Sequence, residues 1–104
     1  MIIYNTTYHA SLRVCDSFVE WLCTWYIPRA KADGTLRRPQ LAQVLNDGTD
    51  ADGYSYALQF GVDSKAELMK WYARVGKKLH EEMTRCFGRD VVGFTTLMME
   101  LDVE

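Results

Sequence analysis

The sequence predicts an α+β fold whose elements follow the order strand, helix, strand, strand, helix, strand. Two observations indicate this order. First, two segments have the apolar period of a core-facing helix. Second, the segments before, between and after them are rich in β-branched and aromatic residues, which favour strands. The chain has 104 residues, of which 48% are hydrophobic and 25% are charged. That size and composition are typical of one domain with one core, which we place at residues 1–104.

The first strand and the first helix are predicted at the start of the chain. Residues 2–9 combine β-branched and aromatic types without Gly or Pro, which favours a strand. The apolar residues that follow recur at helical spacing and form one stripe: Val14, Phe18, Trp21, Leu22 and Trp25. Because Pro28 disfavours helical geometry in the preceding residue, we expect the helix to end or break at Ile27, with a short continuation closed by Gly34.

The next two strands are predicted to form a hairpin. Residues 40–46 are a candidate strand, and residues 46–53 have the composition of a turn. The following segment alternates strictly between large apolar residues and smaller or polar ones, with Tyr54, Tyr56, Leu58, Phe60 and Val62 on one face. This period of two predicts the third strand.

A capping box begins the second helix, since Ser64 and Glu67 can each satisfy a free amide at its start. Its buried stripe is predicted to hold Leu68, Tyr72, Val75, Leu79, Met83 and Cys86. Gly88 is a typical stop, and residues 91–102 are predicted to form the last strand.

This order of elements is typical of a ferredoxin-like plait, a four-stranded antiparallel sheet with both helices on one face. The first and last strands nevertheless carry apolar residues on both faces: Ile2, Tyr4 and Tyr8 oppose Ile3, and Phe94 and Met98 oppose Leu97 and Met99. An apolar sheet face without a helix needs a cover. We therefore predict a homodimer that joins the two open sheet faces.

Charge and cysteine content exclude several classes of protein. The net charge is -2 with acids and bases interspersed, so we expect no nucleic-acid partner. Three Cys without CxxC spacing predict neither a disulfide framework nor a zinc site. The first residues resemble neither a signal peptide nor a membrane span, so we expect a cytoplasmic protein without a membrane partner.

Three segments, 4–9, 25–28 and 92–97, resemble a bacterial family known as domain of unknown function 4286, and the similarity extends over nearly the whole chain. The resemblance implies membership of the dimeric α+β barrel group, in which two plaits join sheet to sheet. That group includes small oxygenases, haem-degrading enzymes and isomerases, with pockets between the helices and the sheet. Fold kinship alone does not assign a reaction.

The haem-degrading branch of that group uses an Asn on the first strand and a Trp and a His on the second helix. The corresponding residues here are Asn5, Trp71 and His80. The nine-residue separation rotates a regular helix by about 180°, so Trp71 and His80 are expected at opposite edges of the buried stripe. A kink near Val75 and Gly76 would be needed to align them. Haem is therefore expected only under this alternative, and otherwise no cofactor is predicted.

A second group of residues fits one pocket better. Tyr72, Gly76 and His80 are spaced four residues apart on one flank of the helix. If Asn5 faces that helix from the first strand, these residues line a pocket that His9 extends, and Trp71 lies nearby. We predict a site for a small planar or apolar metabolite. The alternative is close helix packing across Gly76, with an inert His80.

No motif for nucleophilic or metal catalysis is present in the sequence, and whether the protein is an enzyme stays open. The leading functional hypothesis is a non-catalytic dimeric protein that binds a small ligand or acts as an interaction module. The alternative is an oxygenase similar to antibiotic biosynthesis monooxygenases or to haem-degrading enzymes, which would use the pocket between the second helix and the sheet.

Overall fold

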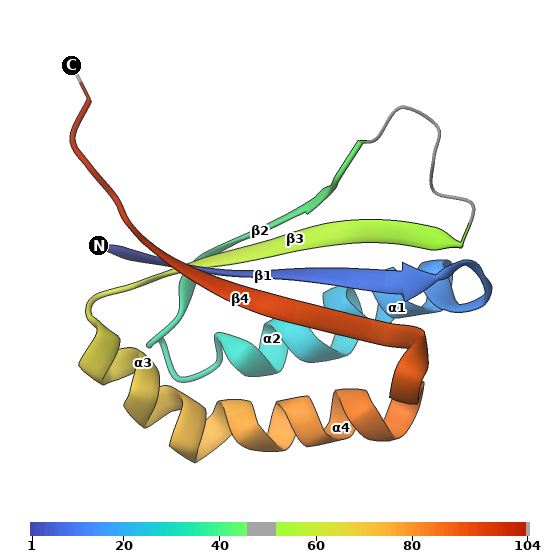
Figure 1. Ribbon diagram of the computed structural model, residues 1–104. Helices are drawn as coiled ribbons and strands as arrows, with labels where there is room; N and C mark the ends of the chain where they lie inside the picture. Colours follow the sequence, from blue (N-terminus) through green and yellow to red (C-terminus); the bar gives the residue numbers. More distant parts are fainter. Residues whose placement is uncertain (46–51, 104) are drawn as a thin grey trace.

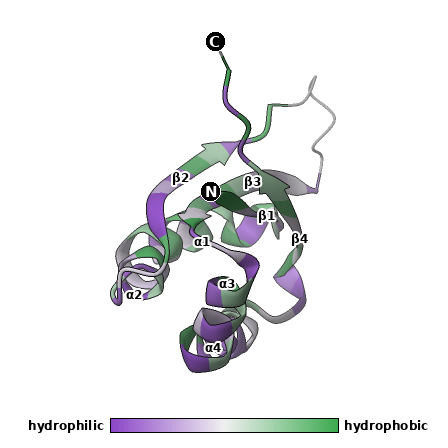
Figure 2. Cartoon of the chain, turned by 90° about the vertical axis from the view of Figure 1, so that its left-hand side faces the viewer, coloured by the Kyte–Doolittle hydropathy of each residue, from purple (hydrophilic) through white to green (hydrophobic). Residues whose placement is uncertain are grey.

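The computed structural model describes residues 1–45 and 52–103 (Figure 1). Four strands form one antiparallel sheet in the order β2-β3-β1-β4, and the helices lie on one of its faces. The strands are β1 (Ile2–Ser11), β2 (Arg37–Gln43), β3 (Gly53–Val62) and β4 (Val91–Met99). The predicted ferredoxin-like α+β plait is confirmed. Figure 2 shows the two layers with β2 and β4 at opposite edges of the sheet.

Each of the two long helical segments contains one turn of π-helix. The first consists of a 3-10 turn (Leu12–Val14), α1 (Cys15–Trp21), a π turn (Leu22–Tyr26) and α2 (Ile27–Ala30). The second consists of α3 (Lys65–Trp71), a π turn (Tyr72–Gly76), α4 (Lys77–Phe87) and a 3-10 turn (Gly88–Asp90). Single π turns inside α-helices are rare and occur often at functional sites.

The first helix was predicted to end or break at Ile27. Its α-helical hydrogen bonding is interrupted in the π turn that directly precedes Ile27, and the helix then continues through Pro28 to Ala30. Pro28 has no N–H to donate inside the continuous helix, and it closely follows the π turn in which the α-helical bonding is interrupted. The Ser64 half of the predicted capping box is present, because the amide of Glu67 donates to Ser64 Oγ over 3.1 Å.

The second strand begins earlier than predicted and includes Arg37 and Arg38. Its register with β3 shifts between Arg37 and Gln40, and Arg38 has a φ of 53°. Pro39 is tolerated because β2 is an edge strand with an irregularity at this point. The predicted turn residues 46–51 lie outside the described residues.

The last strand ends at Met99, three residues before the predicted end. Met99 pairs with Ile2, which is the first residue of β1, so the residues after Met99 have no strand beside them to pair with. Strand length is here set by the neighbouring strand rather than by the apolar pattern. The amide of Glu100 makes a last hydrogen bond to the carbonyl of Met1 over 3.0 Å.

The core lies between the sheet and the two helical segments. Its largest fully buried side chains are Trp71, Phe18, Leu22, Leu36, Leu58 and Val62. The indole Nε1 of Trp71 donates a hydrogen bond to the carbonyl of Ala30 over 2.9 Å, which joins the two helical segments. Phe87 packs edge-on against Phe18 and Trp21, with ring centroids 5.3 and 5.5 Å apart.

The face of the sheet without helices is less uniformly apolar than predicted. Its β4 edge carries the exposed side chains of Val92, Phe94 and Met98, which the register places across from His9, Thr7 and Ile3. Its middle is polar instead. Asn5 of β1 lies there between Gln59 of β3 and Thr96 of β4.

Candidate functional site

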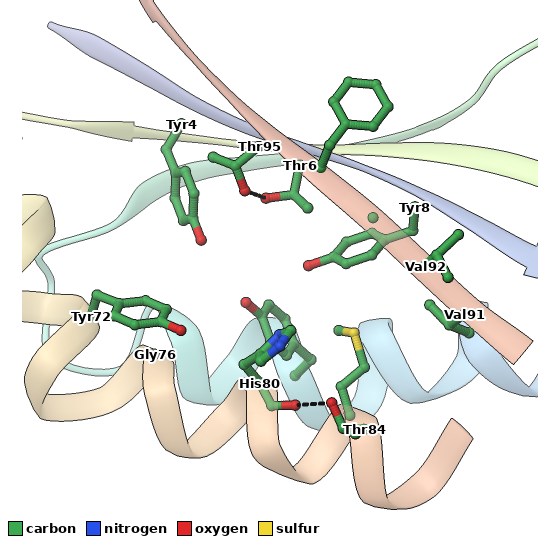
Figure 3. Close-up of a pocket in the computed structure, with 14 residues that line it drawn as sticks. Tyr4, Thr6, Tyr8, Tyr72, Gly76, His80, Thr84, Val91, Val92 and Thr95 are labelled. Atoms are coloured by element: carbon green, nitrogen blue, oxygen red, sulfur yellow. Dashed lines mark hydrogen bonds between the residues drawn. The ribbon is translucent and has the colours of Figure 1, made fainter. Parts of the chain in front are cut away.

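A cavity of about 220 Å³ lies between the helix-facing side of β1 and β4 and the second helical segment (Figure 3). Tyr4, Thr6 and Tyr8 line it from the sheet, because side chains alternate along β1. Tyr72 and His80 line it from the second helical segment. Figure 3 shows the tyrosine hydroxyls turned toward the same space as the His80 ring.

Tyr8 and Tyr26 form the inner end of the cavity. They are only 7% and 5% exposed. Burial, and next the neighbouring phenols, raise the pKa of both side chains above the ordinary value of 10. Burial also raises the pKa of Tyr4. These three phenols are therefore protonated at neutral pH, and each can donate a hydrogen bond without bringing a charge into the cavity.

Tyr72 and His80 stand at the mouth of the cavity, where both side chains are exposed. The backbone of His80 is held in α4, and its carbonyl accepts a hydrogen bond from Thr84 Oγ1 over 3.2 Å. An imidazole can donate or accept a hydrogen bond. The mouth thus offers an imidazole and a phenol, and each protonated phenol at the inner end can donate one hydrogen bond and also accept.

Two further hydroxyls meet on the sheet side of the cavity. Thr6 Oγ1 of β1 and Thr95 Oγ1 of β4 are 3.2 Å apart and share a hydrogen bond. This pair joins the two strands across which the cavity lies.

Both π turns contribute residues to the cavity. Tyr26 is the last residue of the first π turn, and Tyr72 and Gly76 bound the second. A Cβ at position 76 would lie 2.4 Å from Trp71 Cζ3 and 2.9 Å from Tyr72 Cδ1. Gly76 therefore leaves room for both rings of its own helical segment.

The structure brings together three of the six site residues that the sequence indicated. Tyr72, Gly76 and His80 line the same cavity, and ligand binding by them stays a prediction. The partners of these residues on the sheet and on the first helix were not predicted: Tyr4, Thr6, Tyr8, Tyr26 and Thr95. The large even-numbered residues of β1 were the signal for the sheet wall, since they share one face.

Asn5 and His9 do not face this cavity, which corrects the prediction. As odd-numbered residues of β1, they point to the open face of the sheet. Asn5 Nδ2 donates to Thr7 Oγ1 over 3.2 Å, whereas Asn5 Oδ1 is buried and has no partner among the described residues. His9 Nδ1 lies 3.1 Å from Ser55 Oγ, and its Nε2 lies 3.5 Å from Asp52 Oδ1.

Trp71 is also absent from the cavity wall, because its ring is fully buried in the core. The three residues of the haem comparison therefore lie in three different places. Asn5 is on the open face of the sheet, Trp71 is in the core, and His80 is at the cavity mouth. The π turn at Tyr72–Gly76 falls where a kink was considered, but it does not bring Trp71 beside His80. The residues present do not fit the haem site that the resemblance implied.

The fold and the cavity define a ferredoxin-like α+β domain with a tyrosine-lined cavity between its helices and its sheet. The chain belongs to the family described as domain of unknown function DUF4286, whose model matches residues 1–101. No curated protein matches the chain in sequence. No helix in the described residues has the length and apolar character needed to cross a membrane.

Several solved structures share the fold. One is a protein from Deinococcus radiodurans that is described as a proposed antibiotic biosynthesis monooxygenase. Its TM-score is 0.71 and its sequence identity is 13%, with 100% of this chain and 96% of that chain covered. A dimeric ferredoxin-like protein from an uncultured marine organism has a TM-score of 0.70 and 18% identity, with coverage of 100% and 98%. An ethyl tert-butyl ether (EthD) family protein from Bacillus halodurans has a TM-score of 0.69 and 13% identity, with coverage of 97% and 100%.

Proposed function

We propose that this protein binds a compact, planar, uncharged metabolite in the tyrosine-lined cavity. The observation that carries the proposal is the meeting of buried, protonated phenols from two separate elements, Tyr8 of β1 and Tyr26 of the first π turn. An oxygen of the ligand would accept hydrogen bonds from them. The aromatic rings around this point provide flat apolar walls for a planar molecule.

Size and charge narrow the ligand class. At about 220 Å³, the cavity is smaller than the roughly 300–1,000 Å³ of sites for drug-sized ligands, which favours a molecule built on one ring. Among the described residues, no Asp, Glu, Lys or Arg belongs to the cavity wall. A charged ligand would lose its water without gaining an opposite charge, so an uncharged carbonyl compound or phenol is favoured.

Titration of the protein with acetophenone, followed by amide chemical shifts, tests this proposal. Acetophenone has one ring and one acceptor oxygen. Tyr26→Phe removes one donor without changing the shape of the ring, and we expect about 3- to 10-fold weaker binding. Tyr54→Phe is the matched control, because Tyr54 is exposed and lies outside the cavity wall. Absence of saturable shifts at the cavity residues, or equal affinity in Tyr26→Phe, would contradict the proposal.

We also propose that the open sheet face joins a second copy of the chain. Phe94, which is 66% exposed, and its neighbours Val92 and Met98 give this face an apolar edge that a partner would cover. The unpartnered Asn5 Oδ1 in its middle could accept a hydrogen bond from the partner chain. One similar structure is described as a dimeric ferredoxin-like protein, which supports the same assembly.

Light scattering on the purified protein measures this assembly directly. The expected mass is twice the 12.0 kDa of one chain. Phe94→Asp should reduce it to the mass of one chain, because an uncompensated charge would be buried in the interface. Leu12→Asp introduces the same charge at an exposed apolar residue outside the open face and should leave the mass unchanged. A wild-type mass of 12.0 kDa would refute the homodimer.

An oxygenase that works without a cofactor is the second candidate. One arrangement favours it, namely the His80 imidazole beside protonated phenols in the same cavity. Such an imidazole can remove a proton from a bound phenol, and phenolic donors can stabilise the resulting anion. Oxygen uptake with 1,4-dihydroxynaphthalene above the rate in buffer, lost in His80→Ala, would support catalysis. Equal uptake with and without the protein would exclude this substrate class.

A further inference from the structure

A second recess lies directly beside the tyrosine-lined cavity, between α3 and β4. We call it the tail groove. It has a volume of about 350 Å³ and is lined mainly by the apolar residues Leu68, Met69, Ala73 and Leu97. Met69 and Ala73 are four residues apart on one flank of the helical segment, and Leu97 faces them from β4 because it pairs with Tyr4.

The tail groove presents large apolar side chains to solvent. Met69 is 72% exposed and Leu97 is 41% exposed, although both belong to one contiguous recess. An apolar group that covered these side chains would remove them from water, which favours binding. Met69 also has a flexible side chain, which can adapt to the shape of an occupant.

The tail groove and the cavity share part of their walls. Tyr4, Tyr72 and Thr95 line both. A molecule whose oxygen is bound at the inner end by Tyr8 and Tyr26 would pass Tyr4 and Tyr72 to reach the groove. Polarity changes along that path, from the phenols at the inner end to aliphatic side chains in the groove.

We infer that the ligand is amphiphilic, with an uncharged oxygen-bearing ring in the cavity and an alkyl chain in the tail groove. This inference rests on the proposed function, because it assigns the remainder of the ligand bound there. The alkyl chain is inferred because the cavity and the tail groove share Tyr4, Tyr72 and Thr95 in their walls. A ligand ending at the ring would leave Met69 and Leu97 in water, whereas an alkyl chain would cover them.

The C-terminal residues that the structure describes, up to Val103, do not cover the groove. The hydrogen bond from the Glu100 amide to Met1 holds the end of β4 beside the start of β1. Beyond it the chain runs away from the helical layer (Figure 1), and Leu101 is exposed. The groove is thus open to a ligand that enters from solvent.

Binding of a series of phenyl ketones tests the inference. Calorimetric titration with acetophenone, propiophenone, butyrophenone, valerophenone and hexanophenone varies only the alkyl chain. We expect the dissociation constant to fall by about two- to fourfold for each added methylene, since each one leaves water for the apolar groove. Amide shifts of Met69, Ala73 and Leu97 should appear only with the longer members.

Two kinds of variant distinguish binding of the alkyl chain in the groove from binding of the ring in the cavity. Met69→Gln and Leu97→Gln should reduce the dependence on chain length to less than about 1.5-fold per methylene, while acetophenone binds as before. Leu12→Gln, an exposed apolar residue outside the groove, should keep the wild-type dependence. Tyr26→Phe should weaken every member by a similar factor and leave the dependence on chain length intact.

The outcomes distinguish the two proposals. If no member binds, both the proposed function and the inference are overturned. If acetophenone binds but longer chains bind no more tightly, only the amphiphilic ligand is overturned. A dependence on chain length that survives both groove substitutions would place the alkyl chain elsewhere and also overturn the inference. The mass of Met69→Gln is also measured by light scattering. If this variant were a monomer while the wild type is a dimer, the groove would be a contact surface for the partner chain, and the inference would be overturned.

Discussion

The indole ring of Trp71 occupies the space that a side chain at position 76 would need. An added Cβ there would lie 2.4 Å from Trp71 Cζ3, well inside the distance of an ordinary contact. The same ring reaches Ala30 through its Nε1. The core contact between the two helical segments therefore depends on a glycine at the edge of the cavity.

Gly76→Ala should destabilise the protein although alanine is the better helix former. The gain in helix propensity is about 1 kcal/mol. Displacing the buried indole costs about 1–3 kcal/mol, and the Ala30 hydrogen bond is strained as well. We expect a net loss of stability in urea unfolding, whereas Lys78→Ala, at an exposed position of α4, should change it little. Increased stability of Gly76→Ala would show that Trp71 can move freely.

Trp71→Phe should lower the free energy of unfolding by about 2–4 kcal/mol. The substitution leaves a void in the core and removes the donor to the Ala30 carbonyl. Trp25→Phe is the matched control, because Trp25 is only partly buried and stacks against the guanidinium of Arg29, 4.3 Å from its ring centroid. Urea denaturation measures both. Equal losses in the two variants would contradict the special role of Trp71.

Alkaline unfolding should depend on Tyr26. Its folded-state pKa is raised above 10 by burial, so the folded chain keeps a proton that the unfolded chain releases near pH 10. Stability from this group is therefore complete below pH 10 and declines as the pH rises above it. Tyr26→Phe should be less sensitive to pH between about 10 and 11.5 in urea titrations at fixed pH. The same pH sensitivity as in the wild type would contradict the burial of a protonated phenol.

Asp33 should contribute to stability at neutral pH and not in acid. Arg74 donates hydrogen bonds to its carboxylate over 2.7 and 3.2 Å and lowers its pKa, with help from the amide of Thr35. Stability from a lowered pKa is present above the unfolded value of 3.8 and is lost as the pH falls through the folded value. Asp33→Asn should therefore cost about 1 kcal/mol or less at pH 7, and the difference should shrink below pH 4. Asp102→Asn, in the exposed C-terminal segment, should show no such trend.

Part of the site could be predicted because helical spacing is a local property. Tyr72, Gly76 and His80 recur every four residues, so they share a flank, and the π turn between them does not separate them. The face of Asn5 was indicated by β1 itself, because strand alternation puts the polar Asn5 opposite the larger Tyr4. The packing of Tyr4 against Trp71, with ring centroids 6.0 Å apart, shows that the face of Tyr4 meets the helices.

The missed features depend on contacts between distant segments. Tyr26 reaches the cavity through a π turn, whereas Pro28 indicated only that the helix is interrupted nearby. The strand β2 begins before Pro39 because Gly61 of β3 pairs with Arg37. The order of the elements was predictable, since each has its own period and its own stop signals. The extent of β2 and β4 was not, because a strand ends where its neighbour ends.

The π turn at Tyr72–Gly76 has a consequence for comparing related chains. A π turn holds one more residue than the α-helical turn it replaces, so α3 and α4 can keep their faces while an additional position is inserted between them. A relative that is one residue shorter between positions 71 and 77 would then form a regular helix there. Such a relative would show a one-residue gap in an alignment with this chain. The gap would identify relatives in which the residues aligned with Tyr72 and Gly76 do not both reach the cavity, even if the residue aligned with His80 is also histidine.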